Sequence, residues 1–161
     1  MILNNEQQQR LRNLKNPSRN MTRTGWIDTK ARWPNKTALY RMTDNFTHDE
    51  VRVFEKAMLH IANVTCVKFQ KAPASATAYV KIIKNDNWGC RAHVDYQGYV
   101  QYLSATASCI TMGSILHELL HGIEFYHQHT SSDRDLYVRI HLENIEEGME
   151  LFFEKYPPGF F

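Results

Sequence analysis

The chain has 161 residues, of which 43% are hydrophobic and 22% are charged, and its formal net charge is +2. This length corresponds to about one domain, and the composition is that of an ordinary globular protein. No stretch approaches the roughly 18 uninterrupted apolar residues of a membrane span, and so small a net charge does not indicate a nucleic-acid-binding protein. We expect a globular domain, present as a monomer.

The first 23 residues differ in character from the rest of the chain. They hold five basic side chains, a single acidic one and three consecutive glutamines. They contain no apolar core of the kind that a signal peptide requires. We interpret residues 1–23 as a polar, mobile leader.

Beyond the leader, side-chain patterns predict a series of strands and helices. Thr47 and Glu50 have the spacing of a capping box, and apolar side chains recur at helical spacing from Val51 onward. Alternating side chains predict short strands on either side of this helix. In chain order we expect a strand at 38–42, a helix at 48–62, strands at 66–69 and 79–83, an edge strand with a loop over 98–109, and a helix at 146–156.

Sequons and cysteines bear on the compartment of the protein. Four sequons make Asn20, Asn35, Asn45 and Asn63 candidate glycosylation sites and suggest a secreted, extracellular protein. The three cysteines are Cys66, Cys90 and Cys109. In a secreted chain they would make one disulfide and leave one thiol, whereas in a cytosolic protein all three would be reduced.

The stretch from Ser114 to His127 carries the clearest chemistry. His117 and His121 are four residues apart, so on a helix they project from one face, where two imidazoles can hold one metal ion. Glu118 lies beside the first histidine and can take a proton from an activated water. His127 follows beyond the helix end as a third ligand, and three protein ligands with an open position are typical of a catalytic zinc site. The sequence thus predicts one Zn²⁺ per chain.

At this point the sequence resembles a known family. HELLHGIEFYHQHTSSDRDLYVRIHLENI is similar to the zinc signature and downstream segment of the astacin metalloendopeptidases, which belong to the metzincins. Arg32-Trp33-Pro34-Asn35, Cys66-Val-Lys-Phe69 and Gly89-Cys90 resemble further family motifs in the same order. The resemblance covers about residues 24–156.

The resemblance implies a fold and a division of the chain. We expect an α+β fold, the N-terminal half of a metzincin (zincin-like) catalytic domain, with a twisted mixed sheet and two long helices. The peptidase domain would span 24–161, and 1–23 would be the tail of a propeptide that is cleaved after Arg23.

The resemblance also implies roles for particular residues. His117, His121 and His127 would bind zinc, and Glu118 would act as general base and acid. Cys90 and Cys109 would form a disulfide, while Cys66 would pair with a cysteine beyond Phe161. The strand Val100, Gln101, Tyr102 and Leu103 would be the edge on which an extended peptide or protein substrate docks by β-addition.

Four departures from the family pattern stand out. Glu124 replaces a glycine, and a left-handed backbone at an L-residue costs about 1–2 kcal/mol. Gln128 replaces a glutamate and so loses a charge-assisted hydrogen bond. Residues 1–23 contain no aspartate that could cap the zinc, and no Met-turn follows the zinc helix. We therefore expect a chain truncated at both ends, with the C-terminal subdomain missing.

Two functions remain open from the sequence. The first is a secreted zinc metalloendopeptidase that hydrolyses peptide bonds of proteins with a zinc-activated water and Glu118 as general base. The alternative is a catalytically inactive secreted protein, or an inactive fragment, that binds zinc or another protein. Glu124, Gln128 and the missing subdomain favour the alternative, whereas the intact His-Glu-x-x-His motif favours the enzyme.

Overall fold

The computed structural model describes residues 1–13, 29–158 and 160 of the chain. They fall into two compact units, of which the first combines Met1–Ile2 with Asp28–Phe125 and the second combines Leu3–Ile27 with Tyr126–Phe161. Asn20 and the cleavage point expected after Arg23 lie outside the described residues.

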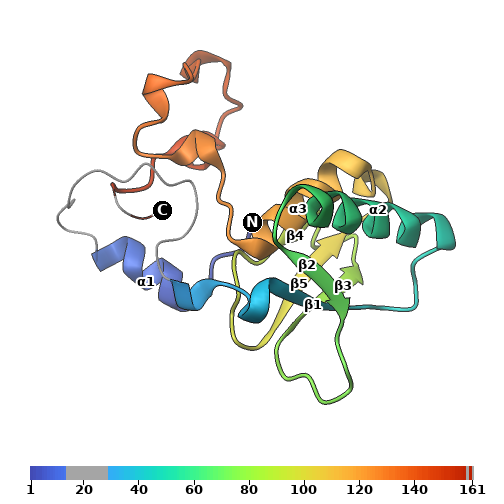
Figure 1. Cartoon of the computed structure of the whole chain (residues 1–161). Helices are drawn as coiled ribbons and strands as arrows, with labels where there is room; N and C mark the ends of the chain where they lie inside the picture. Colours follow the sequence, from blue (N-terminus) through green and yellow to red (C-terminus); the bar gives the residue numbers. More distant parts are fainter. Residues whose placement is uncertain (14–28, 159, 161) are drawn as a thin grey trace. The chain divides into compact units, whose positions relative to one another are not determined.

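The first unit is built on a five-stranded mixed sheet with the order β2-β1-β3-β5-β4 (Figure 1). All neighbouring strands run parallel except β4, which runs antiparallel to β5. This confirms the expected mixed sheet. The strands are β1 (Thr37–Met42), β2 (Lys68–Lys71), β3 (Tyr79–Lys84), β4 (Arg91–Ala92) and β5 (Val100–Ala105).

Two long helices complete the first unit, as the sequence predicted. Helix α2 (His48–Val64) begins at the capping box, in which the Glu50 backbone N–H donates to Thr47 Oγ1 and the Thr47 N–H donates to the Glu50 carboxylate. Helix α3 (Met112–Ile123) begins at Thr111, whose side chain accepts from the Ser114 backbone N–H. Each helix buries one apolar stripe, which fixes its orientation about its own axis.

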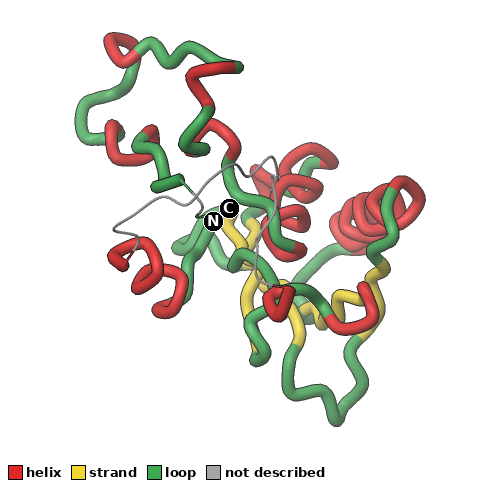
Figure 2. The backbone as a smooth tube through the Cα atoms, turned by 60° about the vertical axis from the view of Figure 1, so that its left-hand side comes forward, coloured by secondary structure: helices red, strands yellow, loops and turns green. Residues whose placement is uncertain are grey.

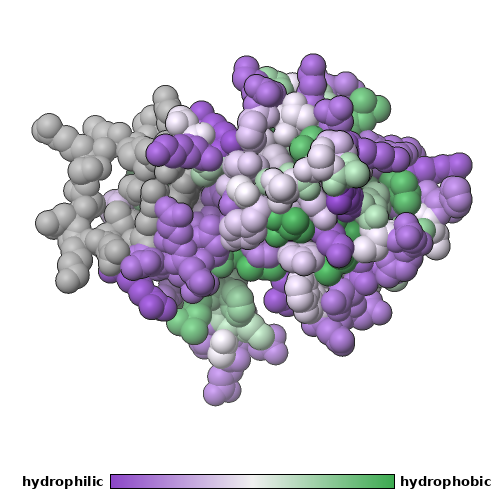
Figure 3. Space-filling model, turned by 90° about the horizontal axis from the view of Figure 1, so that it is seen from below, coloured by the Kyte–Doolittle hydropathy of each residue, from purple (hydrophilic) through white to green (hydrophobic). Residues whose placement is uncertain are grey.

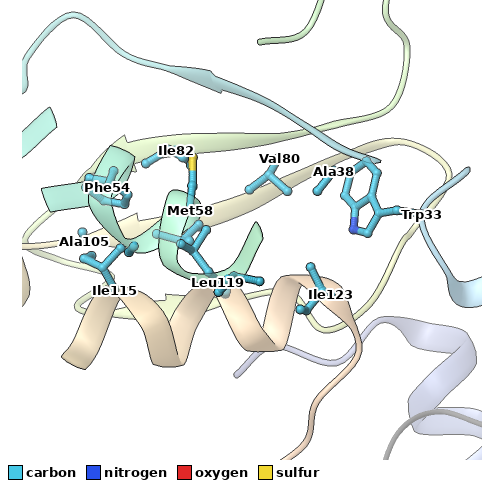
Figure 4. Packing of buried hydrophobic residues seen from close by; sticks show 14 residues of the cluster. Trp33, Ala38, Phe54, Met58, Val80, Ile82, Ala105, Ile115, Leu119 and Ile123 are labelled. Atoms are coloured by element: carbon cyan, nitrogen blue, oxygen red, sulfur yellow. The ribbon is translucent and has the colours of Figure 1, made fainter. Parts of the chain in front are cut away.

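The core lies between these helices and the sheet (Figure 4). Phe54 on α2, Ile82 on β3 and Ile115 on α3 are each completely buried. Burial of Val80 and Ile82 on one face of β3 follows the predicted alternation. The other labelled members of this cluster are Trp33, Ala38, Met58, Ala105, Leu119 and Ile123.

The second unit consists of helix α1 (Asn5–Asn13) and short helical turns joined by loops (Figure 2). Arg134 ties these turns together, because its guanidinium donates to the backbone carbonyls of His129 and Phe153. Tyr126 and Phe160 are both buried and their rings lie edge to face, with centroids 5.3 Å apart.

Residues Asn5–Asn13 of the polar leader form α1, for which the sequence predicted no particular structure. One expectation about helices is wrong. In place of the helix expected at 146–156 there is a single 3-10 turn at Glu150–Phe153. Gly148 explains this difference, because it adopts a φ of 85°, which a continuous right-handed helix cannot contain. The remaining 3-10 turns are Thr29–Ala31, Pro34–Lys36, Ala107–Cys109, Gln128–Thr130, Arg134–Leu136 and Leu142–Asn144.

Hydrophilic residues cover most of the face seen in Figure 3, and smaller apolar areas lie between them. Among the described residues, no helix is both long and apolar enough to cross a membrane.

Candidate metal centre

Helix α3 carries the predicted metal-binding motif. Its apolar residues Ile115 and Leu119 are buried in the core, which leaves His117 and His121 one turn apart on another face. The local sequence therefore determines both where the helix begins and which side presents the histidines.

The two imidazoles converge. His121 Nε2 lies 3.0 Å from His117 Nε2, and the rings meet at 84° with centroids 4.6 Å apart. His121 Nδ1 donates to the backbone carbonyl of Phe125 at 2.6 Å, because a carbonyl oxygen can only accept. This bond keeps the proton on Nδ1 and directs the lone pair of Nε2 toward His117.

Glu118 lies between the two histidines in sequence and is only 7% exposed. Its Oε2 is buried and has no hydrogen-bond partner among the described residues. Burial raises the pKa of the Glu118 carboxyl, while the Met1 ammonium, His117 and a backbone hydrogen bond from Ala92 act in the opposite direction. A buried carboxylate oxygen with no protein partner is placed to serve a ligand or water.

His127 offers the third imidazole. One ligand nitrogen from each of His117, His121 and His127 lies within 4.8 Å of the others. Imidazole nitrogens are ligands that zinc favours, at about 2.0–2.1 Å, and nitrogens 3.0 Å apart can share an ion at that distance. The donor set and the partnerless Glu118 oxygen both fit a zinc ion.

The end of α3 shows the strain that the sequence predicted. Glu124 adopts a φ of 132°, in the region where a glycine would be unstrained, and such a conformation costs about 1–3 kcal/mol. Phe125 N–H donates to Leu120 O and Glu124 N–H donates to His121 O. This pair of bonds is the Schellman pattern, which usually has glycine at its left-handed position.

The strand Val100–Leu103 is not the free edge that we expected. Strand β5 lies between β3 and β4, and β4 pairs with Leu103. Gln101 and Leu103 are each only 1% exposed, so their side chains cannot meet a substrate. The edge strand on this side of the sheet is β4, whose two residues are too few to show an alternating pattern in the sequence.

The cysteines divide as one bonded pair and one thiol. Cys90 and Cys109 form a disulfide that closes a loop with a sequence separation of 19. Cys66 is exposed and is not part of a disulfide.

Sequence reasoning missed the acceptor for His121. The Phe125 carbonyl is a backbone group, and every residue has one, so no side-chain pattern marks it. The only indirect signal was the position of Phe125, which lies four residues after His121 and just beyond the expected end of the helix.

A mixed sheet backed by a helix with two converging histidines and a buried glutamate defines the class of the zinc metalloproteases. Comparison with known families gives the membership. The model of the Astacin peptidase family matches residues 26–159, and the chain belongs to this family. Enzymes of the family are zinc-dependent, and the three histidines could bind that ion.

Individual relatives agree with this assignment. The chain is 39% identical to astacin-like metalloprotease toxin 2 of Loxosceles intermedia over 126 residues, 78% of this chain and 48% of the toxin. It is 33% identical to zinc metalloproteinase nas-6 of Caenorhabditis elegans over 76% of this chain and 35% of that protein. The chain thus spans half or less of the length of these relatives.

A solved structure shows the same fold. High choriolytic enzyme 1, a hatching enzyme zinc-protease from Oryzias latipes, superimposes with a TM-score of 0.70 at 27% identity. The superposition covers 89% of this chain and 70% of that chain.

Proposed function

We propose that this protein is a zinc-dependent metalloendopeptidase that hydrolyses peptide bonds in proteins. The observation that carries the proposal is the convergence of the His117 and His121 Nε2 atoms, 3.0 Å apart, beside a buried glutamate. Membership in the astacin family supports the same activity.

The roles of the residues follow from their chemistry. His117, His121 and His127 would hold one Zn²⁺, with Phe125 orienting His121 through its carbonyl. Bound zinc supplies Lewis acidity, which lowers the pKa of a water to about 7 and polarises a carbonyl. Glu118 accepts the proton of the attacking water and returns it to the leaving amine. Burial raises the pKa of the Glu118 carboxyl, and a raised pKa suits a group that must both take and give a proton.

We further propose that the protein acts outside the cell. The Cys90–Cys109 disulfide requires an oxidising environment to persist. The sequon residues Asn35, Asn45 and Asn63 are exposed, as glycosylation requires. Relatives that are named as toxins of Loxosceles species point in the same direction.

Residues 1–23 would form a propeptide-like leader ahead of a peptidase domain at 24–161. Within residues 1–23, Ile2 pairs in parallel with His93, next to the edge strand β4. Its N–H donates to the Ala92 carbonyl at 2.7 Å, and the Val94 N–H donates to its carbonyl at 3.2 Å. Ile2 thus contacts Ala92, whose backbone also hydrogen-bonds the Glu118 carboxyl.

The test compares the full chain with its Glu118→Gln variant on a fluorogenic peptide, before and after cleavage behind Arg23. Loss of a general base lowers the rate by about 10²–10⁴-fold. Zinc content, measured by mass spectrometry, should stay the same because glutamine leaves all three histidines in place. Equal rates of hydrolysis for the two proteins would refute the enzyme and favour the alternative of a zinc-holding binding protein.

A further inference from the structure

The strained end of α3 is connected directly to the metal centre. Glu124 occupies the left-handed position of the turn, and Phe125 is the next residue. The Phe125 carbonyl accepts the 2.6 Å hydrogen bond from His121 Nδ1. The conformation of Glu124 therefore determines where the acceptor for His121 lies.

A side chain far away in the sequence holds this turn. Arg32 Nε donates to Glu124 Oε2 at 2.9 Å, across 92 residues of chain. The two side chains are 45% and 21% exposed, and ion pairs with this exposure add little to global stability. We therefore expect the contact to affect mainly the local geometry of the turn at Glu124.

Neighbours of Arg32 present it to the turn. The buried Trp33 indole Nε1 donates to the Gly122 carbonyl at 2.7 Å, two residues before Glu124. The Ala31 carbonyl accepts from the Tyr96 N–H at 2.9 Å, and the Tyr96 and Trp33 rings lie 4.8 Å apart. Arg32 is thus flanked on both sides by anchored residues, which limits the entropy lost when its side chain pairs with Glu124.

We propose that Arg32 is a positioning residue of the metal centre: it holds Glu124 in its strained conformation and thereby keeps the Phe125 carbonyl against His121. A glycine would adopt this conformation without strain. In this chain the ion pair between Arg32 and Glu124 stabilises the conformation instead. Arg32 is not one of the candidate metal ligands and acts through its contact with the turn. The inference rests on zinc binding at the site proposed above.

The proposal predicts that the role of Arg32 depends on Glu124. Replacing a partner that orients a ligand typically weakens metal binding by 10–100-fold. Because Arg32 acts one step further away, we expect Arg32→Gln to raise the dissociation constant for Zn²⁺ by about tenfold. Glu124→Gly removes the strain, so it should bind Zn²⁺ at least as tightly as the wild type. In the Glu124→Gly background, Arg32→Gln should have no further effect.

The experiment measures these four proteins as full chains, by competition for Zn²⁺ with a chromophoric chelator. The visible absorption of bound Co²⁺ provides a second readout, because it reports the ligand geometry. Arg32→Gln should alter this spectrum and Glu124→Gly should not. Arg52→Gln is the matched control, since Arg52 forms an exposed ion pair with Asp49 within α2; it should leave both readouts unchanged.

Three other results would contradict the proposal, and they differ in which part of it they refute. If the wild type binds Zn²⁺ and Arg32→Gln binds it equally well, Arg32 has no positioning role, whereas the proposed function stands. If Arg32→Gln weakens binding equally in both backgrounds, its effect does not pass through Glu124. If the wild type binds no Zn²⁺, or His121→Ala binds it as tightly, the proposed function falls together with this inference.

Discussion

Glu50 makes two kinds of contact with one carboxylate. One oxygen accepts from the Thr47 backbone N–H at 2.8 Å and closes the capping box of α2. The other accepts from Lys84 Nζ at 2.6 Å and links the helix to β3. The hydrogen bond from Lys84 is the main cause that lowers the pKa of the Glu50 carboxyl.

A pH-dependent contribution to stability follows from this lowered pKa. As the pH falls, the Glu50 carboxyl of the unfolded chain, with a pKa of about 4.3, binds a proton before the Glu50 carboxyl of the folded protein does. The ion pair therefore stabilises the fold above that pH. Its contribution is lost as the pH falls through about 4.3 toward the lower native value. Glu50→Gln keeps an acceptor for Thr47 but loses the charge. It should therefore be less stable than the wild type at neutral pH, and the two should converge in acid.

Urea unfolding between about pH 3 and 7 measures this difference. Lys84→Met serves as the partner variant, because it removes the same ion pair and leaves the capping box intact. Lys84→Met should lose the part of the pH dependence that comes from the ion pair, whereas Glu50→Gln should also lose the part that comes from the Thr47 hydrogen bond. A difference from the wild type that stays constant across this range would contradict the ion-pair explanation.

Single residues also show what the sequence could reveal about the site. The positive φ at Glu124 was predictable, because a glycine is expected where the chain must turn after such a helix. The Arg32–Glu124 contact was not, since the two residues are 92 positions apart and only the sheet and core bring them together. Side-chain identity marks candidate ligands, whereas their orientation depends on backbone groups that every residue carries.

At the level of elements, α3 depends on its first turn. Thr111 Oγ1 accepts from the Ser114 backbone N–H at 3.3 Å, which satisfies one of the donors left unpaired at the start of a helix. Thr111→Ala should lower the free energy of unfolding by about 1 kcal/mol. Thr111→Ser is the matched control, because it keeps the hydroxyl and should stay close to the wild type. Urea denaturation followed by circular dichroism checks both, and equal losses in the two variants would exclude the cap as the cause.

Helices with caps and apolar stripes were predictable from sequence, and short edge strands were not. The capping box at Thr47 and the stripe that includes Phe54 placed α2 correctly, because both are local signals. Strand β4 is defined by its pairing with β5 and not by its own two residues. The expectation of an edge at Val100–Leu103 therefore failed for a reason outside this segment: β4 pairs with Leu103 and Ser104 on the side of β5 that we expected to be free.

For the molecule as a whole, zinc should act as a stabilising ligand. The ion binds a site that the fold assembles, so it stabilises the folded state by mass action. With free Zn²⁺ at 100 times its dissociation constant, the free energy of unfolding should rise by about 2.7 kcal/mol. A chelator should reverse the increase. His121→Ala should lose it, because that variant removes both a ligand and the bond to Phe125.

His60→Ala is the matched control for this measurement, since His60 is an exposed histidine on α2 and no part of the candidate centre. It should retain the full response to Zn²⁺ in urea denaturation with and without the chelator. A response of His121→Ala equal to that of the wild type would mean that Zn²⁺ stabilises the chain from elsewhere. A response lost in both variants would point to general loosening of the fold, because His60 is exposed on α2 whereas His121 is buried on α3. Only loss in His121→Ala with retention in His60→Ala places the stabilising ion at the end of α3.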